Sequence, residues 1–269
     1  MLYLISTPIG NLGDISQRAR AILESVPVLA CEDTRTTGQL LSLLGITAHK
    51  LIAYHEHNEQ TASKQLMQYL EQGIDVGVVS DAGTPLLSDP GYRLVQLCLD
   101  HHIPVTAVPG ANALLPALQL SGMPTHAFLF GGFLPAKSGA RQSHLNQFKT
   151  TPATLIFYET PNRLADALVD IQTVLGDVFV ATVREITKKF EEVKRGPVSE
   201  LIQFYRDNPT KGEMVVLIDN TLPQKQDTDI DSLIRDLLPD HSVKEIARLL
   251  HEQTGLSKKE IYERALALK

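Results

Sequence analysis

SDAGTPLLSDPG, at residues 80–91, follows the apolar run VGVV (76–79) and precedes a run of helical apolar spacing at 92–99. Open α/β sheets bind their ligands at the carboxyl ends of strands. Glycine at such a place lets the backbone approach a ligand closely, and proline stiffens the loop. The stretch therefore predicts a strand, a ligand-binding loop and a helix, in that order.

Two further loops have the same composition and the same place after a strand. STPIGNLGD (6–14) follows the apolar run at 2–5, and PGANA (109–113) follows the run at 105–108. Each loop taken alone could be only a tight turn between a strand and a helix, because turns use the same residues. Together the three loops favour one composite site for a small molecule.

Short apolar runs alternate with segments of helical spacing through about residue 120. This alternation predicts a mostly parallel sheet covered on both faces. The expected strands are residues 2–5, 27–31, 51–54, 75–79 and 104–108. The expected helices are residues 16–25, 34–44, 58–72 and 92–99.

The pattern changes at residues 121–141, which are rich in Gly, Pro and Phe, and we expect a domain boundary there. The second half offers strands at 128–130, 154–158, 178–184, 191–194 and 214–219, and helices at 161–175 and 197–207. We therefore expect an N-terminal α/β domain at 1–120 and a second α/β domain at 121–220.

The C-terminal part, 221–269, is expected to be a linker followed by a small helical extension. Residues 221–230 are polar and lack periodicity. Helices are expected at 230–238, 243–253 and 258–268, the middle one ended by Gly255. Ser242 with Glu245, and Ser257 with Glu260, have the spacing of capping boxes.

Composition and charge exclude several classes of protein. The chain is 43% hydrophobic and 21% charged, which is normal for a globular protein. Cys31 and Cys98 lie in apolar runs without metal or redox spacing, so we expect buried thiols in a reducing compartment. A strand beginning at residue 2 leaves no room for a signal peptide, and no run is long enough to span a bilayer. We expect a cytoplasmic protein with no membrane partner.

Several catalytic motifs are absent from the sequence. There is no G-x-x-x-x-G-K-[ST], no G-x-G-x-x-G after the first strand and no G-x-S-x-G. A P-loop nucleotidase, an ordinary NAD-binding unit and an α/β hydrolase are therefore unsupported. His55 and His57 alternate in HEH, but no further Cys or His completes a known metal spacing, so we expect no metal.

Seven segments together resemble the tetrapyrrole methylase family, over about residues 1–220. They are TPIGNLGD (7–14), ACEDTR (30–35), SDAGTPLLSDPG (80–91), VPGANA (108–113), FYETPNR (157–163), REITK (184–188) and KGEMV (211–215). Within the family they are similar to a branch that methylates the ribose 2′-oxygen of a cytidine in small-subunit (16S) rRNA. The short C-terminal extension also fits that branch.

The resemblance implies two α/β domains that hold the methyl donor S-adenosylmethionine in the cleft between them. It also implies a homodimer with rRNA as partner. Because the net charge is −6, which argues against a broad basic surface, we expect the substrate to be the assembled small subunit rather than free rRNA. The alternatives are a C-methyltransferase acting on a tetrapyrrole precursor and a non-enzymatic ribosome-assembly factor.

The first loop favours the RNA substrate, because residues 6–11 depart from the family's G-x-G-P-G-D. By resemblance, Pro8 touches the donor, while Asn11 and Asp14 face the acceptor. The other implied donor contacts are Ala82, Gly83, Thr84, Pro85, Ala111, Asn112, Ala113, Phe157, Tyr158, Glu213, Met214 and Val215. Phe157 and Tyr158 could equally belong to the core.

Thr84 stands where the family motif has an aspartate, and Asp81 or Asp89 could supply the missing carboxylate. Asp89 could equally be a helix N-cap. Methyl transfer requires the acceptor oxygen to be aligned with the sulfonium methyl, and a base or a cation would assist a ribose hydroxyl. The charged candidates in the matched segments are Asp14, Glu32, Asp33, Arg35, Glu159, Arg163, Glu185 and Lys188. Asp14 and Glu159 are the predicted catalytic residues.

RNA binding also needs local positive charge. Residues 184–195 carry five cations against three glutamates, and residues 241–269 carry six Lys or Arg against four Glu. Lys137 and Arg141 add positive charge at the domain boundary. The last two helices resemble a helix-turn-helix hairpin, which could dock on rRNA or form a dimerisation bundle.

Overall fold

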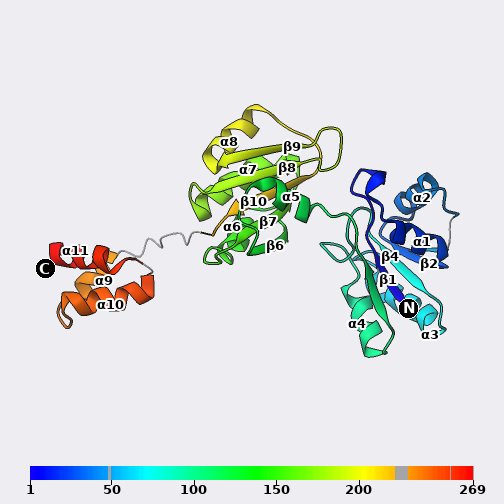
Figure 1. Cartoon of the computed structure of the whole chain (residues 1–269), viewed down its shortest axis with the longest axis horizontal. Coiled ribbons are helices and arrows are strands. Elements are labelled where there is room, and N and C mark those ends of the chain that lie inside the picture. The colour runs from blue at the N-terminus through cyan, green and yellow to red at the C-terminus, as the bar shows by residue number, and fades with distance from the viewer. Residues whose placement is uncertain (48–49, 222–229, 255, 269) are drawn as a thin grey trace. The chain divides into compact units, whose positions relative to one another are not determined.

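The computed structural model describes residues 1–47, 50–221, 230–254 and 256–268. Met1–Phe148 and Ala153–Asp219 form one compact unit, and Lys149–Pro152 with Asn220–Lys269 form another. The first unit contains two five-stranded sheets (Figure 1). The predicted α/β class is confirmed. The division into 1–120, 121–220 and 221–269 stays a prediction.

The first sheet is parallel throughout. Its strands, in the spatial order β3-β2-β4-β1-β5, are β1 (Leu2–Ile5), β2 (Val28–Cys31), β3 (Lys50–Ala53), β4 (Val76–Val79) and β5 (Val105–Val108). All five predicted strands are confirmed to within one residue. Every residue of β2 and β4 is buried, as expected when helices cover both faces of a parallel sheet.

Helices on the two faces of this sheet build two separate cores. Leu23 of α1 (Gln17–Ser25) and Leu41 of α2 (Thr34–Leu43) pack with Leu29 and Cys31. On the opposite face, α3 (Glu59–Glu71) and α4 (Tyr92–Asp100) pack with the alternate strand residues Val28 and Ala30. Both cysteines are free and buried, as predicted.

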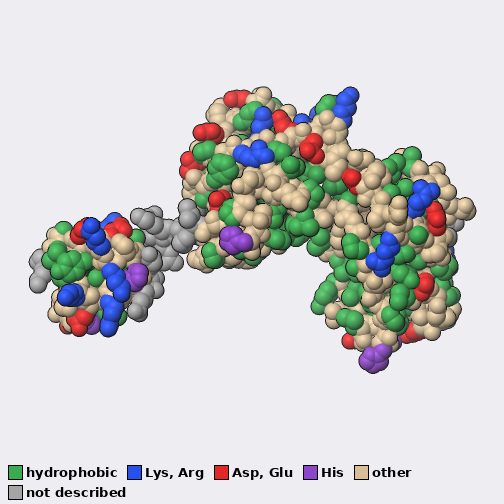
Figure 2. Space-filling model, in the orientation of Figure 1, with side chains coloured by type: hydrophobic (Ala, Val, Ile, Leu, Met, Phe, Trp, Pro, Cys, Tyr) green, Lys and Arg blue, Asp and Glu red, His purple; other side chains and the backbone are tan. Residues whose placement is uncertain are grey.

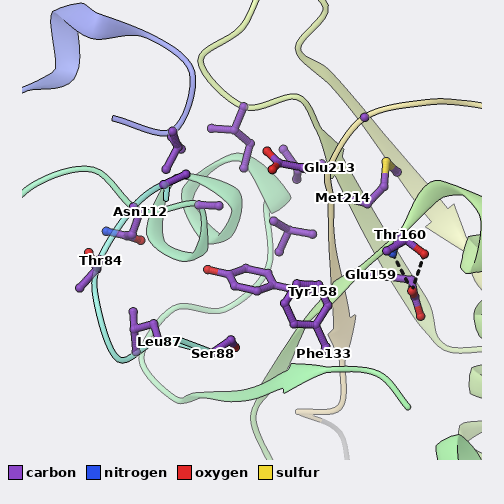
Figure 3. Close-up of a pocket in the computed structure, with 18 of the residues that line it drawn as sticks. Thr84, Leu87, Ser88, Asn112, Phe133, Tyr158, Glu159, Thr160, Glu213 and Met214 are labelled. Carbon is purple, nitrogen blue, oxygen red and sulfur yellow. Dashed lines mark hydrogen bonds between the residues drawn. The ribbon is translucent and has the colours of Figure 1, made fainter. Parts of the chain in front are cut away.

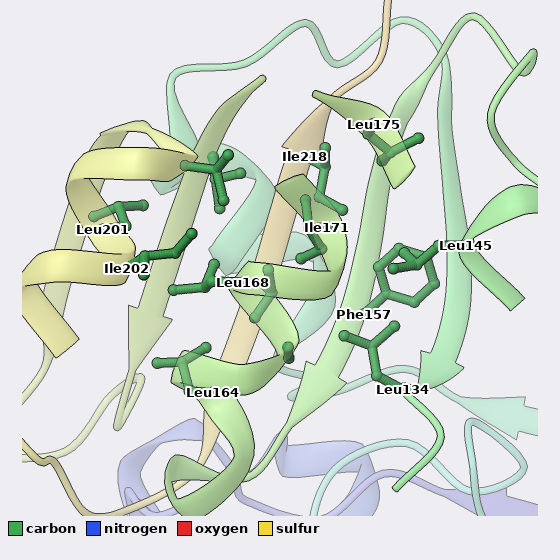
Figure 4. Packing of buried hydrophobic residues seen from close by; sticks show 14 of the residues in the cluster. Leu134, Leu145, Phe157, Leu164, Leu168, Ile171, Leu175, Leu201, Ile202 and Ile218 are labelled. Carbon is green, nitrogen blue, oxygen red and sulfur yellow. The ribbon is translucent and has the colours of Figure 1, made fainter. Parts of the chain in front are cut away.

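The second sheet is mixed. Its strands, in the order β6-β7-β10-β8-β9, are β6 (Phe128–Phe133), β7 (Thr154–Glu159), β8 (Phe179–Arg184), β9 (Glu192–Pro197) and β10 (Met214–Asp219). Only β6 and β7 pair in parallel. One face is covered by α7 (Pro161–Leu175) and α8 (Val198–Asp207), whose Leu168, Ile171 and Leu201 point at the sheet (Figure 4).

Two helices were not predicted. α5 (Leu114–Ser121) contains Pro116 and is apolar on most sides, so it lacks the one-sided pattern of a surface helix. It packs against β8, β9 and β10 of the second sheet. α6 (Ser138–Asn146) starts inside the expected boundary loop and has few apolar residues to reveal its period.

Arg141 lies in α6 and is only 3% exposed, so the prediction that it adds surface charge for RNA is wrong. Its Nε and Nη2 donate to Asp170 Oδ2 of α7 at 2.7 and 2.6 Å. Its Nη1 donates to the carbonyls of Pro135 and Ala136. The side chain therefore joins α6 to α7 instead of facing solvent.

The C-terminal unit is helical. α9 (Ile230–Leu237), α10 (Val243–Thr254) and α11 (Lys258–Leu268) share an apolar core. The capping interaction of Ser242 is confirmed, since its N–H and hydroxyl both donate to Glu245 Oε2 and its Oγ accepts from the Glu245 N–H. Residues 222–229 of the expected linker (221–230) and the Gly255 helix end lie outside the described residues. In the described part of the chain, no helix has the length and apolarity to cross a membrane.

Candidate functional site

A cavity of about 420 Å³ is lined by loops and strand ends from both sheets of the first unit (Figure 3). Ten of the predicted donor contacts line it: Asp81, Ala82, Gly83, Thr84, Asn112, Ala113, Tyr158, Glu213, Met214 and Val215. Pro8 and Ala111 are not among the described residues that line the cavity, although Ile9 is. The structure thus brings most of the predicted contacts together, and their roles stay predictions.

The three glycine- and proline-rich loops are tied to one another. The Thr7 N–H donates to the Gly83 carbonyl at 2.8 Å, and the Gly83 N–H returns a bond to the Thr7 carbonyl at 3.1 Å. Thr84 Oγ1 donates to the Ala111 carbonyl at 3.1 Å. Gly83 has φ +85°, where L side chains are strained, and an added Cβ would lie 3.2 Å from Ile9. These bonds make the loops one continuous wall.

The loop between β4 and α4 holds two non-glycine residues, Leu86 (φ 72°) and Ser88 (φ 70°), in left-handed conformation. Such strain persists only where surrounding structure enforces it, and it concentrates at functional sites. The N-cap of α4 is Gly91 and no side chain caps it, so the alternative that Asp89 caps this helix is wrong. Asp89 lines the cavity instead.

Asp89 lies in an acidic environment. Burial, and next the neighbouring carboxylates of Glu32 and Asp81, raise the pKa of Asp89 to about 6, although a hydrogen bond from Ser80 opposes them. Burial and the same Asp81 also raise the pKa of Glu32. A cation in the cavity would relieve this repulsion.

Tyr158 forms an aromatic wall. Its ring lies edge-on to Phe130 and Phe133, with centroids at 4.8 and 5.4 Å, and points into the cavity (Figure 3). Burial, with the Asp89 and Glu213 carboxylates, raises the pKa of its hydroxyl to about 12, so the group stays protonated. Phe157 points to the other face of β7 and packs in the core. Phe157 therefore belongs to the core, whereas Tyr158 lines the cavity and its contact with the donor stays a prediction.

The predicted catalytic carboxylates have different surroundings. Glu159 is buried in the cavity wall, where Oε1 accepts from the Thr160 N–H at 2.6 Å and from Arg163 Nε at 2.8 Å. Oε2 has no hydrogen-bond partner among the described residues. Asp14 is exposed in the short 3-10 helix Leu12–Asp14, outside the described cavity lining. Both catalytic roles stay predictions.

Sequence reasoning missed part of the lining. The additional residues are Ile9, Leu87, Ser88, Phe133, Thr160, Pro161, Val183, Ile186 and Gly212. Seven of these nine residues lie inside a matched segment and Val183 adjoins one, so taking every residue of each segment as a candidate would have found most of them. Phe133 was missed because the sixth strand was expected to end three residues earlier.

The cavity rim includes an ion-pair network. Lys188 Nζ donates to Glu185 Oε1 at 3.1 Å and to Glu213 Oε2 at 2.9 Å. Glu185 Oε1 also accepts the Glu213 N–H at 3.0 Å. In the ranges that the structure describes, no three His, Cys, Asp or Glu side chains are grouped to hold a metal ion.

Two family models match the chain. One, "Tetrapyrrole (Corrin/Porphyrin) Methylases", matches residues 1–202, and the other, "RsmI C-terminal HTH domain", matches residues 224–269. The ribosomal RNA small subunit methyltransferase I of Escherichia coli O157:H7 is 43% identical over 98% of this chain and 94% of its own length. That of Mesorhizobium japonicum is 45% identical over 100% of this chain and 92% of its own.

Solved structures show the same fold at low identity. Diphthine synthase aligns with a TM-score of 0.65 and 12% identity, over 81% of this chain and 89% of its own. Uroporphyrin-III C-methyltransferase from Thermus thermophilus, complexed with S-adenosyl homocysteine, aligns with a TM-score of 0.56 and 18% identity, over 81% and 97%. The predicted fold type is confirmed.

Proposed function

Because the chain belongs to the tetrapyrrole methylase family, and within it to the ribosomal RNA small subunit methyltransferase I family, we propose that it methylates the ribose 2′-oxygen of a cytidine in 16S rRNA, with S-adenosylmethionine as donor. The predicted family is confirmed, and the chain is a methyltransferase. The proposal that the acceptor is a cytidine 2′-oxygen is supported by the chemistry of the cavity and by the branch of the family that the motifs resemble.

The lining of the cavity is the observation that carries the proposal. Its volume lies within the ~300–1,000 Å³ usual for small-molecule sites. Four carboxylates line it, and no Lys or Arg is among the described lining residues. Glu159 is paired with Arg163 and Glu213 with Lys188, whereas Asp81 and Asp89 form no ion pair with any described residue, so these two supply the uncompensated negative charge. S-adenosylmethionine carries a sulfonium and an ammonium, so this distribution of charge suits the donor. The family motif has an aspartate at the position of Thr84, and we assign the role of that carboxylate to Asp89.

The transfer itself is a direct displacement. The 2′-oxygen attacks the methyl carbon, the carbon–sulfur bond breaks with its electrons on sulfur, and the 2′-hydroxyl proton leaves. The products are S-adenosylhomocysteine and the 2′-O-methyl ribose. Glu159 is one acceptor for the proton because its Oε2 has no bond within the described structure, and Asp14 is the other, on the exposed first loop.

The substrate class follows from the relatives. Relatives named ribosomal RNA small subunit methyltransferase I match nearly the full length of the chain, whereas the tetrapyrrole methyltransferase structures match at 16–19% identity, which is evidence of fold alone. The tetrapyrrole alternative is therefore less supported. Our proposal includes a homodimer that acts in the cytoplasm on the assembled small subunit.

The proposed function predicts methyl transfer to small ribosomal subunits from cells that lack this protein. Labelled S-adenosylmethionine should leave label in 16S rRNA as an alkali-resistant 2′-O-methyl group, and subunits from normal cells should take up none. Label on a base would refute the 2′-oxygen as acceptor. Methylation of naked rRNA that equals or exceeds that of subunits would refute the assembled small subunit as the substrate.

Donor binding should weaken as the pH falls from 7 to 5. With a pKa of about 6, Asp89 is mostly ionised at pH 7 and mostly protonated at pH 5, and only the ionised form attracts the donor's positive charge. We expect the Kd to rise roughly tenfold over this range. Calorimetric titrations at pH 5, 6 and 7 measure it, and an affinity independent of pH would contradict the assignment.

A further inference from the structure

The loop that joins β8 and β9 (residues 185–191, here the β8–β9 loop) displays an aromatic ring that the fold does not use. Phe190 is 63% exposed. Lys189 places its Nζ 5.6 Å from the centre of this ring. One exposed apolar side chain is ordinary, so the meaning of this ring depends on how the loop is built and where it lies.

The β8–β9 loop is held in a strained conformation. Glu185 (φ 50°) and Thr187 (φ 66°) are left-handed, which is costly for residues with side chains. The Thr187 N–H donates to Glu191 Oε2 at 2.7 Å, and the Glu185 N–H donates to the Glu213 carbonyl at 3.1 Å. These bonds fix the conformation, so the Phe190 ring is presented from a defined place.

The base of the loop belongs to the cavity. Ile186 lines the cavity four residues before Phe190, and Glu213, which also lines it, is bound by Lys188. A Cβ on Gly10 would lie 2.5 Å from Lys188 Cε, so the first glycine-rich loop packs directly on this base. A ligand extending from the cavity along this rim would pass the β8–β9 loop, which projects beyond its two strands (Figure 1).

The β8–β9 loop has two lysines, and one of them, Lys189, has no ion-pair partner among the described residues. Arg184 contacts Glu192 and donates to the Lys211 carbonyl, and Lys188 is held by two glutamates. Lys189 is exposed and forms no ion pair with any residue that the structure describes. Figure 2 shows basic side chains at the surface of this loop. A free ammonium beside an exposed ring suits a partner that combines a planar group with an anion.

We propose that the β8–β9 loop binds single-stranded RNA, with the Phe190 ring stacked on an unpaired base beside the methylated nucleotide and Lys189 bound to a phosphate. The inference rests on the proposed rRNA substrate. Proteins recognise unpaired RNA by stacking bases on aromatic rings and by placing cations along the backbone. Stacking here would hold the neighbouring nucleotide and so align the target ribose with the cavity.

The test is methyl transfer by the full-length chain to subunits from cells that lack it. Phe190→Ala should raise the KM for subunits roughly tenfold, the size expected for loss of one stacked base, and leave the Kd for S-adenosylmethionine unchanged. Phe190→Trp should restore the KM, whereas Phe190→Leu, which keeps apolar bulk without a ring, should not. Tyr92→Ala, which removes a 70% exposed ring from α4, is the matched control and should leave both the KM for subunits and the Kd for S-adenosylmethionine unchanged.

A second readout does not depend on catalysis. The chain contains no tryptophan, so Phe190→Trp introduces a single fluorophore at the loop. Its emission should be quenched by added subunits. If the wild type is active, an unchanged KM in Phe190→Ala would overturn the proposal about the loop and leave the proposed function intact. So would the absence of quenching in Phe190→Trp. Loss of self-association in Phe190→Ala would assign the ring to a second copy of the chain. A wild type that neither binds nor methylates subunits would overturn both proposals.

Discussion

Asp89→Asn should weaken the binding of S-adenosylmethionine by roughly 10- to 100-fold, which corresponds to losing a hydrogen bond to a charged group. The amide keeps the size of the side chain and removes its charge. The strained loop around Leu86 and Ser88 would still place it in the cavity wall. Isothermal titration of donor into wild type and variant at pH 7 measures the effect, and the variant should also lose the pH dependence of binding.

The melting temperature of Asp89→Asn separates a loss of donor binding from misfolding of the variant. Because the folded-state pKa of Asp89 is raised, its ionised form is unfavourable in the unliganded protein at pH 7, and any stability from this group is lost as the pH rises through 6. Asn removes the repulsion from Glu32 and Asp81, so the melting temperature without donor should be unchanged or higher. Asp100→Asn, at the exposed end of α4, is the matched control and should bind donor normally. Equal affinities for Asp89→Asn and wild type would refute the donor-binding role.

Asp170→Ala should lower the free energy of unfolding by ~3–5 kcal/mol, a large part of the stability of an ordinary domain. The Arg141 guanidinium would remain buried without its carboxylate. Ser138 Oγ and Gln142 Nε2 would lose their acceptor Oδ1 as well. Burial raises the pKa of Asp170, but the hydrogen bonds from Gln142, Ser138 and Arg141 outweigh it and hold the pKa below its usual value.

Urea denaturation followed by circular dichroism measures this loss. Since the pKa is lowered, the pair's contribution should persist down to about pH 4 and disappear only as the pH falls through the folded-state pKa. Glu24→Ala is the control because Arg20 and Glu24 form a pair whose side chains are each 49% exposed. Such exposed pairs contribute at most about 1 kcal/mol to the free energy of unfolding. Equal losses for the two variants would mean that burial adds nothing to the Arg141 pair.

The strands and the loop positions could be predicted from the sequence, because both depend on local order along the chain. Runs such as Val76–Val79 are apolar throughout, which marks a strand covered on both faces, and the Gly- and Pro-rich loops begin where these runs stop. Ten residues predicted from motifs to contact the donor consequently lie together around one cavity.

Charge was less predictable than position. Arg141 was expected at the surface, but it pairs with a carboxylate 29 residues away, which no local pattern reveals. The cations of residues 184–195 looked like an RNA-binding cluster. In the structure Lys188 is held by two glutamates and Arg195 donates to the carbonyls of Leu120 and Ser121. Partners from distant segments, such as Glu213 for Lys188 and Leu120 for Arg195, therefore help to decide which cations remain free.

The sequence by itself determined the α/β class, the family and the segments that surround the cavity, since short-range patterns and motifs carry that information. Only the tertiary structure decided that Asp89 lines the cavity instead of capping α4, that Phe157 is core while Tyr158 faces the cavity, and that the Phe190 ring is left exposed. The physical reason is that burial, pKa and pairing depend on neighbours brought together by folding, and those neighbours are remote along the chain.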